Sequence, residues 1–349
     1  MQLGDYLVDA VNRGASDVFI LPGRPVVFKI GDKFFDAGEE KLMPYASNQL
    51  IKEIYDFSDN KSFDDGIKDD DLAIMIPGVS RFRVNVFRQR FTMGAVIRTV
   101  ALGIPDHSKI NIPDVLMTMS NLKRGMVLIT GTTGSGKSTT LACLINSINL
   151  NRDAHIITIE DPIEYRHDHK KSVVTQREIG SDTISYSMAL RAALRQCPDV
   201  ILVGEMRDHE TIATAISAAE TGHLLLSTLH TMSAASTVER IIDVFPSQQQ
   251  NQIRTQLGGS LQAIVSQQLL PSLDGNVVPA FEILVANSAV RNLIREGKPH
   301  QLNNVIASSR NDGMISMDTS ILSLYKKRMI SKEVALFHAN NPTELVKRL

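Results

Sequence analysis

Hydrophobic residues between positions 125 and 230 fall into short continuous runs that alternate with stretches of helical spacing. The runs predict buried strands at 126–130, 155–159, 200–203 and 224–228. The stretches between them predict helices near 138–149, 185–196 and 209–220. Because such alternation is typical of parallel sheets covered on both faces, it predicts an α/β domain with helices on both sides of a mostly parallel sheet.

The first hundred residues follow a different pattern, in which helical stripes and short strands are mixed. Apolar spacing predicts two helices, one through Leu3, Leu7, Val8 and Val11 and one through Leu50, Ile51 and Ile54. Runs bounded by turn residues predict strands at 18–21, 26–30, 72–76 and 81–87. We therefore expect a smaller N-terminal α+β domain over 1–100, a polar, proline-punctuated linker over 101–112, and a second domain over 113–349.

Beyond Pro246 the pattern is predominantly helical. One stripe contains Ile253, Leu257, Leu261, Ile264 and Val265. Further helices are expected near 288–296, 317–328 and 331–339.

Composition excludes several classes of protein. The 38 acidic and 37 basic residues nearly cancel, so no strong field for nucleic acid is expected. Two cysteines, Cys143 and Cys197, cannot form a four-cysteine zinc site. No apolar run approaches the ~20 residues of a membrane span, and Asp5 and Asp9 lie where a signal peptide would be apolar. Membrane contact is therefore expected only through partners.

A phosphate-binding loop follows the strand at 126–130. Its pattern, G-x-x-x-x-G-K-[ST], is formed by Gly131, Thr132, Thr133, Gly134, Ser135, Gly136, Lys137 and Ser138. Glycines let backbone N–H groups surround a phosphate, and the following helix N-terminus favours negative charge. Lys137 would reach the β- and γ-phosphates of a nucleotide, and the Ser138 hydroxyl would bind Mg²⁺.

Glu205 is the candidate catalytic carboxylate, because it follows the strand at 200–203. Ligands of open parallel sheets bind beyond the carboxyl ends of the strands. There a carboxylate can polarise and orient the water that attacks the γ-phosphate. The alternative is that Glu205 only holds Mg²⁺ through water, and position alone does not separate the two roles. Gly204 stands where an Mg²⁺-holding aspartate is usual.

Other polar residues follow the neighbouring strands. Glu160 and Glu164 could polarise water or help to hold hydrated Mg²⁺, with a capped turn at Asp161-Pro162 as the alternative. His230 could donate a hydrogen bond to the γ-phosphate. His223 could do the same, although a histidine beside an apolar strand is usually structural.

Two further pairs of residues can be interpreted either as functional sites or as ordinary surface residues. Arg81 and Arg83 alternate with apolar residues, so a period of two places both on one face of a strand. That face could meet the phosphates of a nucleotide bound by a neighbouring subunit, or simply form surface salt bridges. His167 and His169 invite a metal-site interpretation, but their highly polar segment favours a solvated loop.

These segments resemble the sequence boxes of the type II/IV secretion ATPase superfamily. The phosphate loop resembles its Walker A motif, 159–164 its Asp box, 198–208 its Walker B motif, and 219–223 with 228–231 its His box. Two further stretches are similar to the retraction ATPases of type IV pili. They are residues 81–85 and the motif Ala289, Val290, Arg291, Asn292, Leu293, Ile294, Arg295 and Glu296. The resemblance covers nearly the whole chain.

The resemblance implies a PAS-like N-terminal domain joined to a RecA-like P-loop NTPase domain, in a homo-hexameric ring. It implies Mg²⁺-dependent ATP hydrolysis, with Thr139 in the nucleotide site and Arg81, Arg83 and Arg98 contributing across subunits. It implies action at the cytoplasmic face of the inner membrane, on a PilC-like platform protein that disassembles the pilus during twitching motility. Residues 291–296 are then expected to serve retraction rather than hydrolysis.

Three other functions share parts of this evidence. A sibling motor, such as a PilU-like accessory retraction ATPase or a Dot/Icm-type secretion ATPase, would have the same core. A RecA-type nucleic-acid translocase is disfavoured, because the charge is balanced and no basic, aromatic-lined groove is indicated. A module that senses nucleotide without hydrolysing it is disfavoured by Glu205.

Overall fold

The computed structural model describes residues 2–31, 33–58, 61–64, 66–100 and 103–349. The chain forms two compact units, Met1–Gly103 and Ile104–Leu349. Of the stretch expected to be a linker, residues 101–102 lie outside the described residues and 104–112 belong to the second unit. Ile112 is buried in the core of that unit, so this part of the stretch packs rather than simply connecting.

The first unit is an antiparallel sheet with two helices on one face. Its strand order is β3-β2-β1-β6-β5-β4, and apolar residues of the sheet and both helices form one core. The elements are α1 (Leu3–Asn12), β1 (Asp17–Ile20), β2 (Val27–Ile30), β3 (Lys33–Asp36), α2 (Pro44–Asp56), β4 (Asp69–Ile76), β5 (Ser80–Gln89) and β6 (Thr92–Val100). The expected stripe on α1 is wrong at Val8, which is 38% exposed, whereas Ala10 is buried. Strands β3 and β6 were not predicted.

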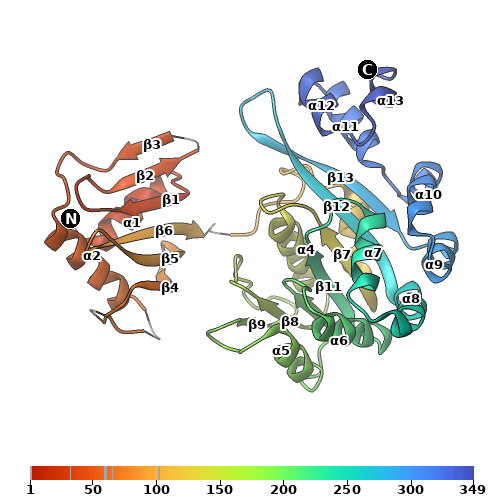
Figure 1. Ribbon diagram of the computed structural model, residues 1–349, viewed down its shortest axis with the longest axis horizontal. Helices are drawn as coiled ribbons and strands as arrows, with labels where there is room; N and C mark the ends of the chain where they lie inside the picture. The colour runs from red at the N-terminus through yellow and green to blue at the C-terminus, as the bar shows by residue number, and fades with distance from the viewer. Residues whose placement is uncertain (1, 32, 59–60, 65, 101–102) are drawn as a thin grey trace. The chain divides into compact units, whose positions relative to one another are not determined.

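The second unit is built on a seven-stranded sheet of order β13-β12-β7-β11-β10-β8-β9. All neighbouring strands are parallel except β12 and β13, which form an antiparallel hairpin. The strands are β7 (Gly125–Thr130), β8 (His155–Glu160), β9 (Val173–Glu178), β10 (Val200–Val203), β11 (Leu224–Leu229), β12 (Leu261–Pro271) and β13 (Val277–Val285). The expected mostly parallel sheet is therefore confirmed (Figure 1).

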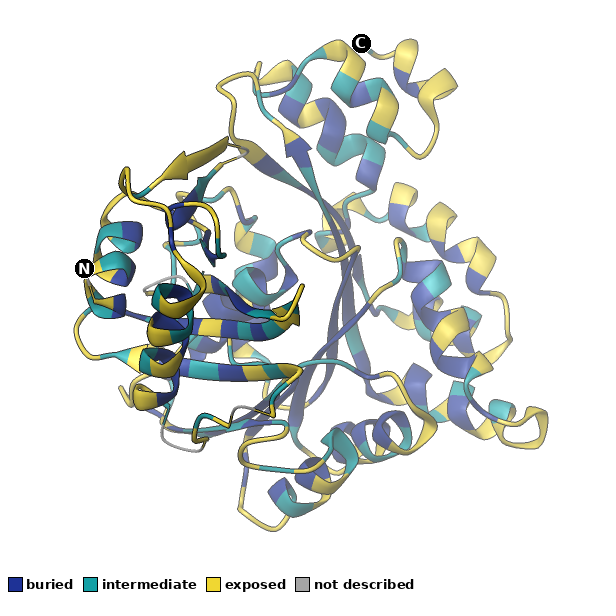
Figure 2. Ribbon diagram, turned by 60° about the vertical axis from the view of Figure 1, so that its left-hand side comes forward, coloured by how far each residue is buried: buried dark blue, intermediate teal, exposed yellow. Residues whose placement is uncertain are grey.

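Helices cover both faces of this sheet. One face packs against α3 (Asp114–Met117) and α4 (Lys137–Asn151). The other packs against α5 (Tyr186–Ala193), α6 (His209–Glu220), α7 (Ala234–Asp243), α8 (Ser247–Ser260), α9 (Ser288–Arg295) and α10 (Leu302–Ser308). Successive residues of β7 alternate between the two cores, as a strand requires. Figure 2 shows the buried residues concentrated in the strands and on the helix faces turned toward them.

The chain beyond Pro246 is less helical than its spacing predicts. Leu261, Ile264 and Val265 lie in β12 rather than on a continuation of α8, so that part of the prediction is wrong. Strand β12 lies between β7 and β13 and is covered on both faces. The continuous apolar run of such a strand cannot be distinguished from a buried helix by periodicity alone. The outer part of the hairpin packs against α11 (Met317–Lys326), α12 (Lys332–His338) and α13 (Pro342–Val346).

Candidate nucleotide-binding and catalytic site

The phosphate loop joins β7 to α4 through glycines that cannot be replaced without strain. Gly131 has φ +146°, and a Cβ there would lie 2.3 Å from the carbonyl oxygen of Gln267. Gly136 has φ +87° and directly precedes α4, where a Cβ would lie 2.7 Å from the Gln267 side chain. The loop therefore passes close to β12. Its backbone N–H groups lie at the N-terminus of α4, where an anion is favoured.

Lys137 lies along the inside of this loop. Its Nζ donates hydrogen bonds to the carbonyl oxygens of Gly131 at 2.9 Å and Thr132 at 2.8 Å. Burial lowers the pKa of Lys137, while the charges of Glu205 and Glu164 act in the opposite direction. The ammonium is held by neutral carbonyls, so an anion in the loop would provide it with a stronger partner.

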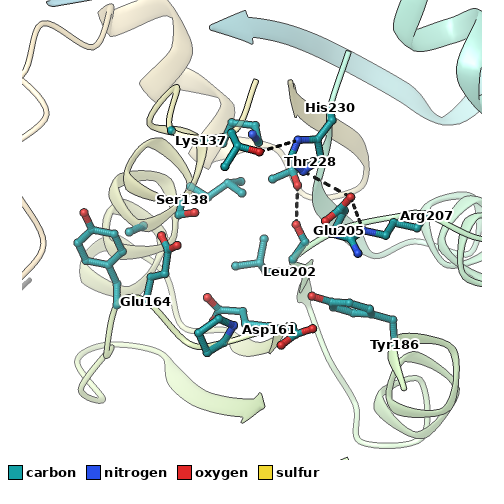
Figure 3. A pocket seen from close by; sticks show the side chains of 18 of the residues that line it. Lys137, Ser138, Asp161, Glu164, Tyr186, Leu202, Glu205, Arg207, Thr228 and His230 are labelled. Atoms are coloured by element: carbon teal, nitrogen blue, oxygen red, sulfur yellow. Dashed lines mark hydrogen bonds and ion pairs between the residues drawn. The ribbon is translucent and has the colours of Figure 1, made fainter. Parts of the chain in front are cut away.

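A cavity of about 280 Å³ opens at the carboxyl ends of β7, β8, β10 and β11. It is lined by residues that follow each of these strands, and Figure 3 shows Lys137 and Ser138 on one side with Glu205 and His230 on the other. Glu205 follows β10, the second strand from β7 in the sheet, because β11 lies between β7 and β10. The structure thus brings together residues that lie up to a hundred positions apart in the sequence.

Glu205 contacts Arg207 and His230 through one of its oxygens. Arg207 Nε lies 2.6 Å from Oε1 and His230 Nε2 lies 3.4 Å from the same atom (Figure 3). Burial on its own raises the pKa of Glu205, but the hydrogen bond from Arg207 and the charges of His230 and Arg207 outweigh it and lower the pKa. The ionised carboxylate of Glu205 lines the cavity, where water can reach it.

Glu160 and Glu164 line the same cavity but differ in environment. Burial raises the pKa of Glu160 to about 7, against the hydrogen bonds from Thr158 at 2.6 Å and Gln176 at 3.4 Å. Glu164 is exposed at the cavity mouth. Glu160 therefore changes charge near neutral pH, which is typical of residues at functional sites.

The two candidate histidines lie at opposite ends of β11. His230 follows the strand, lines the cavity, and has Nδ1 3.5 Å from the Thr133 hydroxyl. His223 precedes the strand and its Nδ1 lies 3.0 Å from the carbonyl oxygen of Ala218. Six residues of strand span about 20 Å, so the structure separates His223 from the cavity within this chain. The His box includes both histidines, but its two parts lie at opposite ends of β11, and the sequence alone does not show this separation.

The segment after Glu164 is mostly exposed, as its polarity predicts, but the prediction of a solvated loop is wrong at His167. His167 is only 7% exposed, lines the cavity, and has no partner for Nδ1 among the described residues. Burial lowers the pKa of His167 to about 4, so its imidazole is neutral. His169 is exposed, and its Nδ1 accepts a hydrogen bond from Val174 N at 3.0 Å. The segment connects β8 to β9, which pair in parallel. Local composition does not reveal that this pairing brings His167 against the sheet.

Sequence reasoning also missed two tyrosines of the cavity wall. The Tyr165 hydroxyl lies 2.9 Å from the Thr139 hydroxyl, which ties the segment to α4. Tyr186 lies at the first position of α5 and reaches the cavity from another element. A tyrosine among ordinary helix residues carries no sequence signal of such a position.

The candidate arginines lie in the first unit, on one face of its sheet. Phe82 and Val84 are buried whereas Arg83 is exposed, as the period of two predicts. Arg83 pairs directly with Arg98 across β5 and β6, and Arg98 Nε lies 3.0 Å from Asp17 Oδ1. Arg81 precedes them on the same face. Arg98 thus has a carboxylate partner, and an anion would compensate the charge that Arg83 adds beside it.

The motif at 289–296 forms α9, which is remote from the cavity. Val290 and Ile294 are buried, and Arg291 donates hydrogen bonds to the carbonyl oxygens of Gly258 at 2.9 Å and Gly259 at 2.8 Å. These contacts satisfy the end of α8. Asn292, Arg295 and Glu296 are exposed.

The oxygen donors near the loop fit a hydrated Mg²⁺. The Ser138 hydroxyl and the carboxylates of Glu160, Asp161 and Glu164 all line the cavity, and Mg²⁺ prefers oxygen ligands while keeping several waters and substrate phosphates. Among the described residues no group of three histidine, cysteine or acidic side chains is arranged to enclose a metal. The site thus fits an ion shared with a phosphate rather than a protein-enclosed one.

In the described parts of the chain, no helix has both the length and the apolar character that a bilayer crossing requires.

The sheet, the glycine loop and the carboxylate two strands away define a P-loop nucleotide-binding protein. A family model described as type II/IV secretion system protein matches residues 2–301. The chain belongs to this family, and within it is a PilT-like ATPase.

Individual relatives match along nearly the whole chain. The chain is 42% identical over 344 residues to the type IV pilus retraction ATPase PilT of Pseudomonas aeruginosa, covering 98% of this chain and 99% of the relative. It is 39% identical over 336 residues to the type IV pilus ATPase PilU of the same organism, covering 96% and 88%. A crystal structure of the pilus retraction motor PilT with bound ADP matches with a TM-score of 0.91, 41% identity and full coverage of both chains.

Proposed function

We propose that this protein is the ATP-hydrolysing motor that retracts type IV pili and so powers twitching motility. The observation that carries the proposal is the cavity in which the phosphate loop faces Glu205. The full-length similarity to a pilus retraction ATPase supports it. We assign the second unit as a RecA-like P-loop NTPase domain and the first as a PAS-like domain.

In this proposal the loop holds the phosphates of ATP. Backbone N–H groups of the glycine-rich turn bind the β-phosphate, and Lys137 leaves the Gly131 and Thr132 carbonyls to pair with the phosphates. Ser138 and the nearby carboxylates Glu160 and Glu164 would hold Mg²⁺, directly or through water. When bound, Mg²⁺ neutralises charge on the phosphates.

Glu205 then orients the attacking water through Oε2 and accepts its proton as the bond to phosphorus forms. Arg207 and His230 fix the carboxylate through Oε1 and keep it ionised. His230 is also placed beside Thr133 of the loop. The position of His230 would therefore depend on whether a γ-phosphate is present. Its contact with Glu205 would transmit a change in that position to the carboxylate.

The cationic face of the first unit supports a shared site. We propose that six chains form a ring and that Arg81, Arg83 and Arg98 bind the phosphates held by an adjacent subunit. Such an arrangement makes hydrolysis depend on the relative position of subunits, and changes in that position transmit work.

We infer that the ring works at the cytoplasmic face of the inner membrane, bound to a PilC-like platform protein. Contact with the membrane would come only through that partner. The exposed face of α9, with Asn292, Arg295 and Glu296, is the proposed contact for retraction.

The proposal is tested in cells that lack this chain. They are expected to carry persistent, unretracted pili and to lose twitching motility. A plasmid copy of the wild type should restore both properties, and a Lys137→Ala copy should not. Absent pili in the deletion strain would indicate an assembly motor, and unchanged retraction would overturn the proposal.

A further inference from the structure

One hydroxyl in the cavity has no partner within the described chain. Tyr186 is half-buried, its ring packs against the core beneath α5, and its Oη points into the cavity (Figure 3). None of the hydrogen bonds formed by the described residues includes this oxygen. The hydroxyl is therefore able to form a hydrogen bond with the contents of the cavity, such as water.

The hydroxyl occupies the space just beyond the end of β10. A Cβ added to Gly204 would lie 3.1 Å from Tyr186 Oη and 3.2 Å from the Ile159 carbonyl oxygen. Gly204 is the position at which an aspartate is usual in this type of site. The polar group at the strand end is therefore supplied from α5, and the residue at 204 must be small to admit it.

The carboxylates of Glu160, Asp161 and Glu205 line the same cavity as this hydroxyl. Burial raises the pKa of Tyr186, and the charges of Asp161, Glu205 and Glu160 raise it further against that of Arg207. The group thus keeps its proton at all working pH values. It can donate one hydrogen bond to a carboxylate and still accept one from water.

We propose that Tyr186 positions the attacking water together with Glu205. This inference rests on the proposed ATP hydrolysis. One hydrogen of the water is donated to Glu205 Oε2 and the other to Tyr186 Oη, while the Tyr186 hydroxyl donates to Asp161. With both hydrogens held, a lone pair of the water oxygen is directed at the γ-phosphorus.

The proposed hydrolysis step needs no reactant other than ATP and water. The water oxygen forms a bond to phosphorus, the bond from phosphorus to the bridging oxygen of ADP breaks, and the water proton passes to Glu205. Tyr186 keeps its own proton throughout. Its contribution is therefore one of orientation, which affects turnover and not the binding of nucleotide.

The test is Tyr186→Phe, which removes the hydroxyl and keeps the ring. The kcat for ATP is expected to fall about tenfold, the equivalent of one well-oriented hydrogen bond. The KM for ATP, the Kd for a non-hydrolysable ATP analogue and the melting temperature should stay at wild-type values. Tyr325→Phe is the matched control, because Tyr325 is also half-buried but lies on α11 outside the cavity.

A second measurement uses Gly204→Ala. Its methyl group displaces the hydroxyl, so it should cost more turnover with Tyr186 present than in the Tyr186→Phe background. An unchanged kcat in Tyr186→Phe would overturn the inference, as would a raised Kd with unchanged kcat, which would indicate a nucleotide contact. If wild type itself fails to hydrolyse ATP, the proposed function fails instead.

Discussion

At the residue scale, the chemistry depends on one carboxylate oxygen of Glu205. Glu205→Gln keeps the shape and the contacts but removes the charge that accepts the water proton. We expect kcat for ATP to fall by roughly 10²–10⁴, with the Kd of a non-hydrolysable analogue within about twofold of wild type. Glu239→Gln, on the exposed face of α7, is the control. Turnover near wild type in the Glu205 variant would reject the assignment.

The raised pKa of Glu160 predicts how the stability of the protein depends on pH. Its pKa is raised from 4.5 to about 7 because burial penalises the charged form. Between these values the folded state binds more protons than the unfolded state, so Glu160 makes stability fall as pH rises from about 5 to 7. Glu160→Gln should remove this fall.

The Tm of Glu160→Gln relative to wild type should thus be higher at pH 8 than at pH 5. The difference should be a few degrees, at about 2–4 °C for each kcal/mol. Thermal melts across this range provide the measurement, with Glu239→Gln following the wild-type profile. Parallel profiles for wild type and Glu160→Gln would show that the group titrates normally.

At the scale of elements, Arg291 joins α9 to the end of α8. Arg291→Ala leaves the Gly258 and Gly259 carbonyls without their donor. We expect the free energy of unfolding to fall by about 2–3 kcal/mol, measured by denaturant titration, with kcat retained under native conditions. Arg295→Ala, on the exposed side of the same helix, should cost less than ~0.5 kcal/mol. Equal losses for the two variants would contradict this role of Arg291.

The paired strands β5 and β6 place Arg83 beside Arg98. Arg83→Ala removes charge from that face without disturbing the core. We expect nucleotide binding to persist and kcat of the assembled protein to fall at least about tenfold, since arginines supplied in trans contribute roughly 10³–10⁵ in related phosphoryl transfer. Lys33→Ala on β3 is a control of equal charge change. An unaffected kcat would leave these arginines as surface residues.

At the scale of the whole molecule, a shared site predicts complementation between subunits. Arg83→Ala and Lys137→Ala chains are each expected to be inactive, but mixed rings contain interfaces with an intact loop beside intact arginines. With random mixing these form up to about a quarter of the interfaces, so ATPase activity should rise toward that fraction of wild type. Activity that never exceeds the sum of the separate variants would contradict a shared site.

Sequence predicted much of the second unit, because its signals are local. A strand covered on both faces must be apolar, and a phosphate loop must carry glycines where the backbone turns. The strands β7, β8, β10 and β11 and the residues that follow them were therefore found in order. The prediction for 261–265 was wrong because the signal there is not local. Whether this segment is helical or extended depends on the strands beside it.

The chain by itself determined the loop, the strand-end carboxylates and the alternation of strands with helices, since each follows from spacing along the backbone. Only the tertiary structure decided which of those residues meet. It separated His223 from His230, buried His167, and brought Tyr186 to the space above Gly204. Strand order and helix packing set these distances, and both arise from contacts between residues far apart in the chain.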